Sequence, residues 1–368
     1  MHELAKDPMN APAAQQERAS HAGAHAGDAA VALDTGAAGG RRVGAGVAAV
    51  DAAAGGAAGD DGTAAPGVGA RLAQAGSVAM LTLLRLVSFA PYAVLRRIGD
   101  AGGMLLYWLV VPRRRIARTN LRLCFPELSE AERVALMKAH FRYFTRSFFD
   151  RFVLWYQPES RIRDLVRVEG VAHLEAVAGR PVILLAPHFV GLDAGGTRMS
   201  IERRMFSMFA NQKNQVLNQA MREGRSRFND AMLLSRLDGL RTAIRLLRQQ
   251  VPFYFLPDMD LGARDAVFVP FFGVPAATVT SVARLAQMTG AVVVPCVTEM
   301  TDDGYVCHFH PAWEDYPGAD LAQATARMNR FIEDRVREMP AQYLWTHKRF
   351  KTRPPGEPDL YARAAQLS

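Results

Sequence analysis

The pattern of hydrophobic and polar positions divides the chain into a polar tail, an apolar stretch and a long alternation of short and long segments. Large apolar side chains are almost absent from residues 1–70 and become dense in residues 78–111. Charged residues and a proline interrupt that stretch at Arg85, Pro91, Arg96, Arg97 and Asp100. A spanning helix needs about 20 nearly uninterrupted apolar residues. The pattern therefore favours membrane contact, either by a poor transmembrane anchor or by amphipathic helices lying in the interface, over an ordinary buried hairpin.

The rest of the chain alternates between helical and strand patterns. Ser129 and Glu132 have the spacing of a capping box and open a predicted helix that ends near residue 156. Short apolar runs predict buried strands at 181–186, 251–256 and 291–296, and an alternating run predicts another at 305–310. Helical spacing is found at 231–249, 280–288 and 319–339. This order predicts an α/β fold with a central, mostly parallel sheet flanked by helices.

Three parts of the chain follow from these patterns. Residues 1–70 are roughly half Ala and Gly and cannot bury enough apolar area to fold, so we expect a disordered tail. Residues 71–112 are expected to form the membrane-associated helical segment. Residues 113–368 are expected to form the α/β domain.

Charge adds a preference for anionic partners. The net charge is +8, yet residues 1–70 carry four basic and eight acidic residues, so the remainder carries +12. Such a surface favours nucleic acid or phospholipid. The basic cluster Arg113, Arg114 and Arg115 directly follows the apolar stretch, as is typical of the cytoplasmic side of a membrane. The three cysteines have no paired spacing and are expected to be buried apolar residues.

The candidate chemistry centres on His188. The predicted strand at 181–186 ends just before His188, which places the imidazole at the carboxyl end of a strand, where open α/β sheets hold their active sites. Asp193 lies five residues later and is expected to fold back onto one ring nitrogen, leaving the other free as a general base. A helix-capping Asp and a structural His are the alternative. No nucleophile motif accompanies the pair, which favours direct transfer to an external hydroxyl over a covalent intermediate.

Two further stretches contain groups that suit an anionic ligand or a metal. Arg222, Arg225 and Arg227 lie within six residues, and guanidinium groups bind phosphate in a bidentate manner. Asp258 and Asp260 follow the predicted strand at 251–256, where carboxylates can bind metal, orient arginines or cap the next segment. An Asp-x-Asp pair after an apolar strand also suits a metal-dependent glycosyltransferase.

Five stretches, taken together and in order, resemble the lipid A secondary acyltransferases, which belong to the lysophospholipid acyltransferase superfamily. The resemblance covers roughly residues 78–361. It rests on NLRLCFPELS at 120–129, HFVGLD at 188–193, GRSR at 224–227, PDMDLG at 257–262 with VFVPFFG at 267–273, and QYLWTHKRFKTRP at 342–354.

The resemblance implies acyl transfer from an acyl-carrier-protein thioester to a hydroxyl of a lipid A precursor, without metal or other cofactor. Carried over by motif, His188 is the general base and Asp193 its orienting partner. Arg225 and Arg227 would bind phosphate or the developing oxyanion, and Asp260 would hold an arginine or the surroundings of the histidine. These roles imply an acyltransferase domain at 113–368 that works at the cytoplasmic face of the inner membrane.

Three alternatives remain open from the sequence. The acceptor could be another polar lipid. A glycosyltransferase would use Asp258 and Asp260 with a divalent metal. A non-catalytic binder of membranes or nucleic acid would use the basic body of the chain, although no nucleic-acid motif is present.

Overall fold

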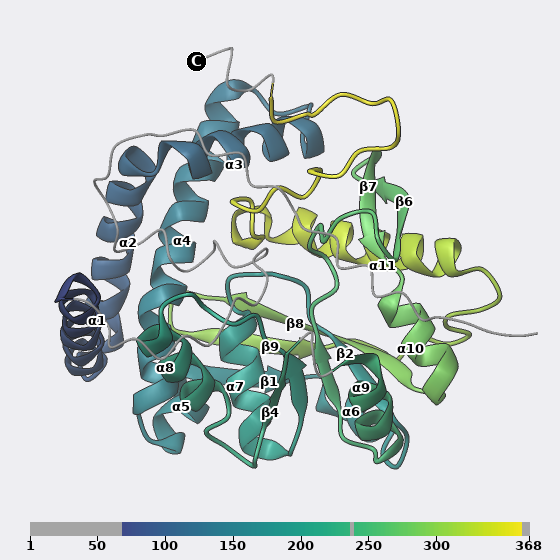
Figure 1. Cartoon of the computed structure of the whole chain (residues 1–368), viewed down its shortest axis with the longest axis horizontal. Helices are drawn as coiled ribbons and strands as arrows, with labels where there is room; N and C mark the ends of the chain where they lie inside the picture. The colour runs from purple at the N-terminus through teal and green to yellow at the C-terminus, as the bar shows by residue number, and fades with distance from the viewer. Residues whose placement is uncertain (1–67, 236–238, 363–368) are drawn as a thin grey trace, which may run out of the picture. The chain divides into compact units, whose positions relative to one another are not determined.

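The computed structural model of the chain describes residues 68–235 and 239–362. The predicted disordered tail therefore lies outside the described residues, except for its last three positions. A seven-stranded sheet forms the centre of the described part, with a separate two-stranded hairpin beside it (Figure 1). This architecture confirms the predicted α/β class.

The strand order is β1-β9-β8-β2-β5-β3-β4. The strands are β1 (Val166–Glu169), β2 (Val182–Leu185), β3 (Phe206–Met208), β4 (Met232–Leu234), β5 (Phe253–Phe255), β8 (Val292–Met300) and β9 (Tyr305–Phe309). Five strands are mutually parallel: β8, β2, β5, β3 and β4. Strand β9 runs antiparallel to β8, and β1, at the edge of the sheet, is parallel to β9. The carboxyl ends of the five parallel strands thus share one edge of the sheet.

Helices cover both faces of this sheet, as its fully buried strands require. One hydrophobic cluster includes residues of α1 (Val68–Val87), α4 (Glu130–Tyr156), α7 (Leu192–Glu202) and α8 (Gln215–Arg225). The other includes residues of α3 (Val111–Cys124), α9 (Gly239–Arg248), α10 (Ser281–Thr289) and α11 (Leu321–Glu338). Successive β2 residues alternate between the clusters: Leu184 joins the first, and Ile183 and Leu185 join the second. The remaining elements are α2 (Tyr92–Leu109), α5 (Glu159–Leu165), α6 (Val171–Glu175), β6 (Ala266–Phe271), β7 (Val274–Val279) and η2 (Pro340–Gln342).

Most of the predicted elements are present. The capping box at the start of α4 has both of its hydrogen bonds, between Ser129 and Glu132. The prediction of one helix over 231–249 is wrong in its first part, because Met232–Leu234 forms strand β4 and pairs in parallel with β3. The apolar run that resembled a helix face is used as a short strand, and the helix begins only at Gly239.

The apolar stretch after the tail forms two helices that separate near Pro91, α1 and α2. Helix α2 packs closely on α4, since a Cβ at Gly103 would lie 2.5 Å from the carbonyl oxygen of Phe141. Among the helices of residues 68–235 and 239–362, we find none with the length and apolar content that a membrane crossing requires. Both helices nevertheless leave large apolar side chains exposed: Val78, Leu83, Leu86, Val94, Ile98, Leu105, Trp108 and Leu109.

Candidate active site

His188 and Asp258 meet at the carboxyl edge of the sheet. Strands β2 and β5 are parallel neighbours, and Leu185 is paired with Phe255. Each of the two site residues lies three positions beyond that pair, so the polypeptide emerges from two adjacent strand ends with His188 beside Asp258. The ring Nδ1 lies 2.7 Å from Oδ1 of Asp258, and the backbone N–H of His188 donates to Oδ2 at 2.9 Å.

This pairing fixes the tautomer of the neutral imidazole. Because an ionised carboxylate only accepts hydrogen bonds, Nδ1 carries the hydrogen, and in the neutral ring Nε2 is the nitrogen with the free lone pair. Burial alone would raise the pKa of Asp258, but attraction to His188 and the two hydrogen bonds from that residue outweigh it and lower the pKa below its usual value. The Asp258 side chain is 1% exposed and that of His188 is 16% exposed. A buried carboxylate thus orients a base that solvent can reach.

Asp193 does not contact the imidazole in this arrangement, contrary to the expectation from its spacing. It lies in the first turn of α7, where its carboxylate forms ion pairs with Arg151 of α4 at 2.6 Å and Arg225 of α8 at 2.7 Å. Burial would raise the pKa of Asp193, but these two guanidinium groups lower it overall. The physical reason is that Arg151 and Arg225, two permanent cations on neighbouring helices, bind the Asp193 carboxylate more strongly than a neutral imidazole would. The imidazole of His188 is instead hydrogen-bonded to Asp258.

Arg225 and Arg227 face different surroundings. Arg225 pairs with Asp193 and its guanidinium also lies over the Phe209 ring. Arg227 donates to the carbonyl of Leu154 at 3.1 Å, and burial lowers its pKa. The structure therefore brings Arg225 into the Asp193 cluster and ties Arg227 to the end of α4.

Asp260 supports the loop after β5, and no arginine among residues 68–235 and 239–362 pairs with its carboxylate, contrary to one expectation from the sequence. Its carboxylate accepts hydrogen bonds from the backbone and hydroxyl of Thr352 at 2.6 and 2.7 Å, and its own N–H donates to Nε2 of His347 at 3.0 Å. Burial lowers the pKa of His347 to about 4, so the ring is neutral at pH 7 and accepts that hydrogen bond. Asp260 thus contacts His347 and Thr352, and its expected role in the surroundings of His188 stays a prediction.

The closing stretch at residues 342–354 lies against the His188 segment. Leu344 donates its N–H to the carbonyl of His188 at 3.0 Å, and Phe189 forms a β-bridge with Tyr343. Asn120 of α3 donates to the carbonyls of Trp345 and His347, both at 2.7 Å. Stretches that are far apart in the sequence are thus joined around His188 and Asp258.

Sequence reasoning missed the roles of three residues. Asp258 was considered as a metal ligand, an arginine partner or a cap, and not as the partner of His188, although its place after a predicted buried strand was a usable signal. Arg151 and His347 gave no local signal, because each acts on a residue more than 40 positions away. Within residues 68–235 and 239–362, no three His, Cys, Asp or Glu side chains are grouped to hold a metal ion.

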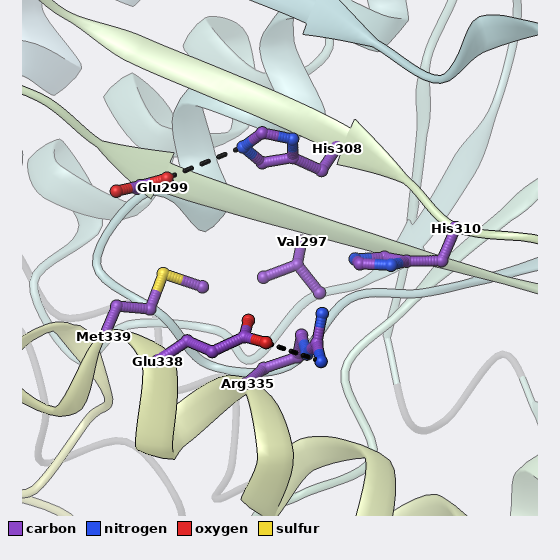
Figure 2. Close-up of a pocket in the computed structure, with 7 residues that line it drawn as sticks. All are labelled: Val297, Glu299, His308, His310, Arg335, Glu338 and Met339. Atoms are coloured by element: carbon purple, nitrogen blue, oxygen red, sulfur yellow. Dashed lines mark ion pairs between the residues drawn. The ribbon is translucent and has the colours of Figure 1, made fainter.

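A small cavity of about 210 Å³ lies elsewhere, between strands β8 and β9 and the end of α11 (Figure 2). It is lined by Val297, Glu299, His308, His310, Arg335, Glu338 and Met339. His308 lies 3.6 Å from Glu299, and Arg335 is paired with Glu338 at 2.7 Å. Its lining charges are paired with one another, and the cavity contains neither His188 nor Asp258.

The fold and the site together define an α/β protein with a histidine base held by a buried carboxylate at the edge of its sheet. Comparison with known proteins then supplies a family. The sequence profile described as "Bacterial lipid A biosynthesis acyltransferase" matches residues 71–352. The chain belongs to this family of acyltransferases.

Similar proteins of known activity cover most of the chain. The lipid A biosynthesis palmitoleoyltransferase of Escherichia coli (strain K12) is 35% identical over 276 residues, which are 74% of this chain and 89% of that protein. The lauroyltransferase of the same organism is 35% identical over 76% of this chain and 92% of its own length. The myristoyltransferase is 33% identical over 73% and 84%. A solved 1-acyl-sn-glycerophosphate acyltransferase, PlsC from Thermotoga maritima, matches 67% of this chain and 100% of that chain at 14% identity, with a TM-score of 0.35.

Proposed function

We propose that this chain transfers a fatty acyl chain from an acyl-carrier-protein thioester to a hydroxyl of a lipid A precursor. Family membership supports the acyl transfer and the lipid A acceptor. The observation that carries the mechanism is the pairing of His188 Nδ1 with Asp258, which leaves Nε2 as the ring nitrogen directed away from the carboxylate, on a partly exposed side chain. No side chain that could serve as a covalent nucleophile needs to be invoked.

In the proposed reaction, Nε2 of His188 removes the proton of the acceptor hydroxyl as its oxygen attacks the thioester carbonyl. Asp258 stabilises the imidazolium that forms. The tetrahedral intermediate collapses to an ester and expels the thiolate, which takes the proton back from the imidazolium. One C–O bond forms, one C–S bond breaks, and the imidazole returns to its starting state without a covalent acyl-enzyme.

Arg151 and Arg225, the two partners of Asp193, supply positive charge near this base, since Asp193 follows His188 by five residues. Asp193 neutralises one of its two partners, so Arg151 and Arg225 together keep a surplus of one positive charge. Guanidinium groups bind phosphate and oxyanions strongly. We infer that Arg225, held by Asp193, binds an anionic group of a substrate or the developing oxyanion. Arg227 is the second candidate for that role.

The exposed apolar side chains of α1 and α2 support a membrane-bound protein. Leu86 is 65% exposed and Trp108 is 62% exposed, although both are large and apolar. Contiguous apolar surface of this kind marks membrane or protein contacts. Arg113 and Arg114 at the start of α3 follow this face directly. We infer that α1 and α2 lie in the interface of the inner membrane at its cytoplasmic face, with these arginines near the headgroups.

The function is tested by mass spectrometry of envelope lipids from cells with and without the gene. Deletion is expected to remove one secondary acyl chain from lipid A, and the wild-type gene is expected to restore it. A gene encoding His188→Ala is expected to leave the chain missing at equal protein level, since general-base catalysis is worth about 10²–10⁴-fold. Restoration by His188→Ala would contradict the mechanism. An unchanged lipid A with an altered second polar lipid would establish the alternative acceptor instead.

The glycosyltransferase alternative has lost its basis in the structure. That alternative needs Asp258 and Asp260 to bind one metal ion together, but Asp258 is hydrogen-bonded to His188 and Asp260 to Thr352. The family is one of acyltransferases.

A further inference from the structure

Helix α9 presents a row of arginines that the proposed chemistry does not use. Its sequence GLRTAIRLLR contains three arginines and no acidic residue. Arg241, Arg245 and Arg248 are all exposed, while Ala243, Leu246 and Leu247 face the core. Spacings of four and three residues place the three guanidinium groups on one side of the helix. Within the described residues, none of the three forms an ion pair.

The other strongly basic helix, α3, is different in this respect. Arg118 and Arg122 both pair with Glu130, at 2.6 and 3.3 Å. Arg113 and Arg114 donate to backbone carbonyls of Thr346 and Tyr107. Four arginines of α3 therefore have partners within the fold, whereas the α9 arginines have no carboxylate partner in the part of the chain that the structure describes. Among the side-chain hydrogen bonds between described residues, one involves an α9 arginine: Arg248 donates to the carbonyl of Met288 at a long distance of 3.3 Å.

Topology places the start of α9 at the same edge of the sheet as His188. Strand β4 ends at Leu234, and β4 is parallel to the strands that lead to His188 and Asp258. The helix begins at Gly239 and leads back to β5, whose end precedes Asp258. The helix therefore starts at the edge that holds the site and extends about 15 Å along the protein, at about 1.5 Å per residue, and its three arginines span about 10 Å of that length.

This helix also lies away from the surface proposed for the membrane. Residues of α1 belong to the hydrophobic cluster on one face of the sheet, and residues of α9 belong to the cluster on the other. Figure 1 shows α1 and α2 at one side of the sheet and α9 at the other. Two exposed apolar side chains flank the arginines, Leu240 at 49% and Met288 of α10 at 48%. Arginines beside exposed apolar groups are a composition typical of protein interfaces.

We propose that the exposed face of α9, formed by Arg241, Arg245, Arg248, Leu240 and Met288, is the docking surface for the acidic protein that carries the acyl thioester. This inference rests on the proposed function, which names an acyl carrier protein as donor. Complementary charge steers such a partner to the surface and sets its orientation. A carrier bound there lies at the edge of the sheet where its thioester must reach His188, while the lipid acceptor approaches from the side of α1 and α2.

The test compares a charge-reversed protein with a matched control. The variant Arg241→Glu/Arg245→Glu is assayed beside Arg167→Glu/Arg180→Glu, which makes the same charge change at exposed arginines of β1 and of the segment before β2. Each protein is given two donors with the same acyl chain, acyl carrier protein and acyl-pantetheine, which has the thioester without the protein. The α9 variant is expected to raise KM for the carrier by about tenfold or more and to keep its rate with acyl-pantetheine. The control is expected to match wild type with both donors, and wild-type KM for the carrier is expected to rise with salt.

Four results would overturn the proposal. An unchanged KM for the carrier in the α9 variant would show that α9 is not the docking surface, without affecting the proposed function. Equal losses with both donors would assign these arginines to the fold or the chemistry. Loss of binding to anionic phospholipid vesicles, with KM for the carrier unchanged, would make the face a membrane contact. A wild-type protein that takes no acyl chain from the carrier, while using acyl-pantetheine, would refute the proposed donor itself.

Discussion

The two buried carboxylates near the site differ in what they face, and this difference decides their roles. Asp258 faces an imidazole at 2.7 Å, and in the proposed reaction it would stabilise the positive charge that forms on that ring. Asp193 faces two guanidinium groups that are always charged, so its interaction is constant. We therefore assign orientation of the base to Asp258 and the positioning of Arg151 and Arg225 to Asp193.

Replacement of Asp193 tests the second assignment through stability. Asp193→Asn leaves two guanidinium groups without a counter-charge in a largely buried site, which is expected to cost about 3 kcal/mol at pH 7. Since the folded-state pKa of Asp193 is lowered, its contribution is present above the usual Asp pKa of about 3.9 and disappears as pH falls through the folded-state value. Thermal unfolding should thus show a Tm gap to wild type that narrows toward pH 3.

The control for this measurement is Asp164→Asn, at an exposed position of α5. It is expected to leave Tm close to that of wild type at pH 7 and at pH 3. Equal Tm values for Asp193→Asn and wild type at pH 7 would show that the arginine cluster does not stabilise the fold.

The sequence placed His188 at the end of its strand, but it pointed to Asp193 as the neighbouring carboxylate, whereas the structure has Asp258 there. The strand end identifies His188, because a buried run followed by a histidine needs only local information. The partner depends on which strands are adjacent, and the order β2-β5 arises from packing of the whole sheet. Asp193 is five residues from His188 in sequence, yet α4 and α8 bring Arg151 and Arg225 to it.

At the scale of the elements, long and periodic segments were predicted well and short ones were not. Helices α4, α10 and α11 follow clear helical spacing, and α4 also has its capping box. Strand β4 has three residues and was absorbed into the helix that follows it, since apolar runs this short fit either structure. The cysteines show that sequence spacing does not reveal contacts between strands. Cys296 and Cys307 are buried as expected, but their Sγ atoms lie 3.4 Å apart on the neighbouring strands β8 and β9.

The exposed face of α1 and α2 yields a prediction for these two helices. Full burial of a large apolar side chain is worth about 1.5–3 kcal/mol. Leu86→Ser/Trp108→Ser is therefore expected to weaken binding to phospholipid vesicles by about tenfold or more, measured by co-sedimentation. The control Leu240→Ser/Met288→Ser removes as many exposed apolar side chains from α9 and α10 and should leave vesicle binding unchanged. Equal losses in the two variants would contradict the assignment of the membrane face to α1 and α2.

At the scale of the whole molecule, membrane binding, donor binding and chemistry are proposed to occur at three different places. The face of α1 and α2 is assigned to the membrane, the face of α9 to the acyl donor, and the carboxyl edge of the sheet to the chemistry. Family signatures in the sequence indicated acyl transfer, and the closing stretch at 342–354 lies against the His188 segment. The two surfaces were less predictable, since the availability of an arginine depends on whether the fold gives it a carboxylate partner.

The most direct test of the central claim is the rate of acyl transfer by purified Asp258→Asn beside Asp193→Asn, with acyl carrier protein as donor and a lipid A precursor as acceptor. Asparagine at 258 can still bond the ring but cannot stabilise its positive charge. The account predicts that Asp258→Asn lowers kcat by a factor on the order of 10² or more, close to the loss in His188→Ala, with a smaller effect in Asp193→Asn. A folded Asp258→Asn protein with nearly wild-type kcat would contradict it.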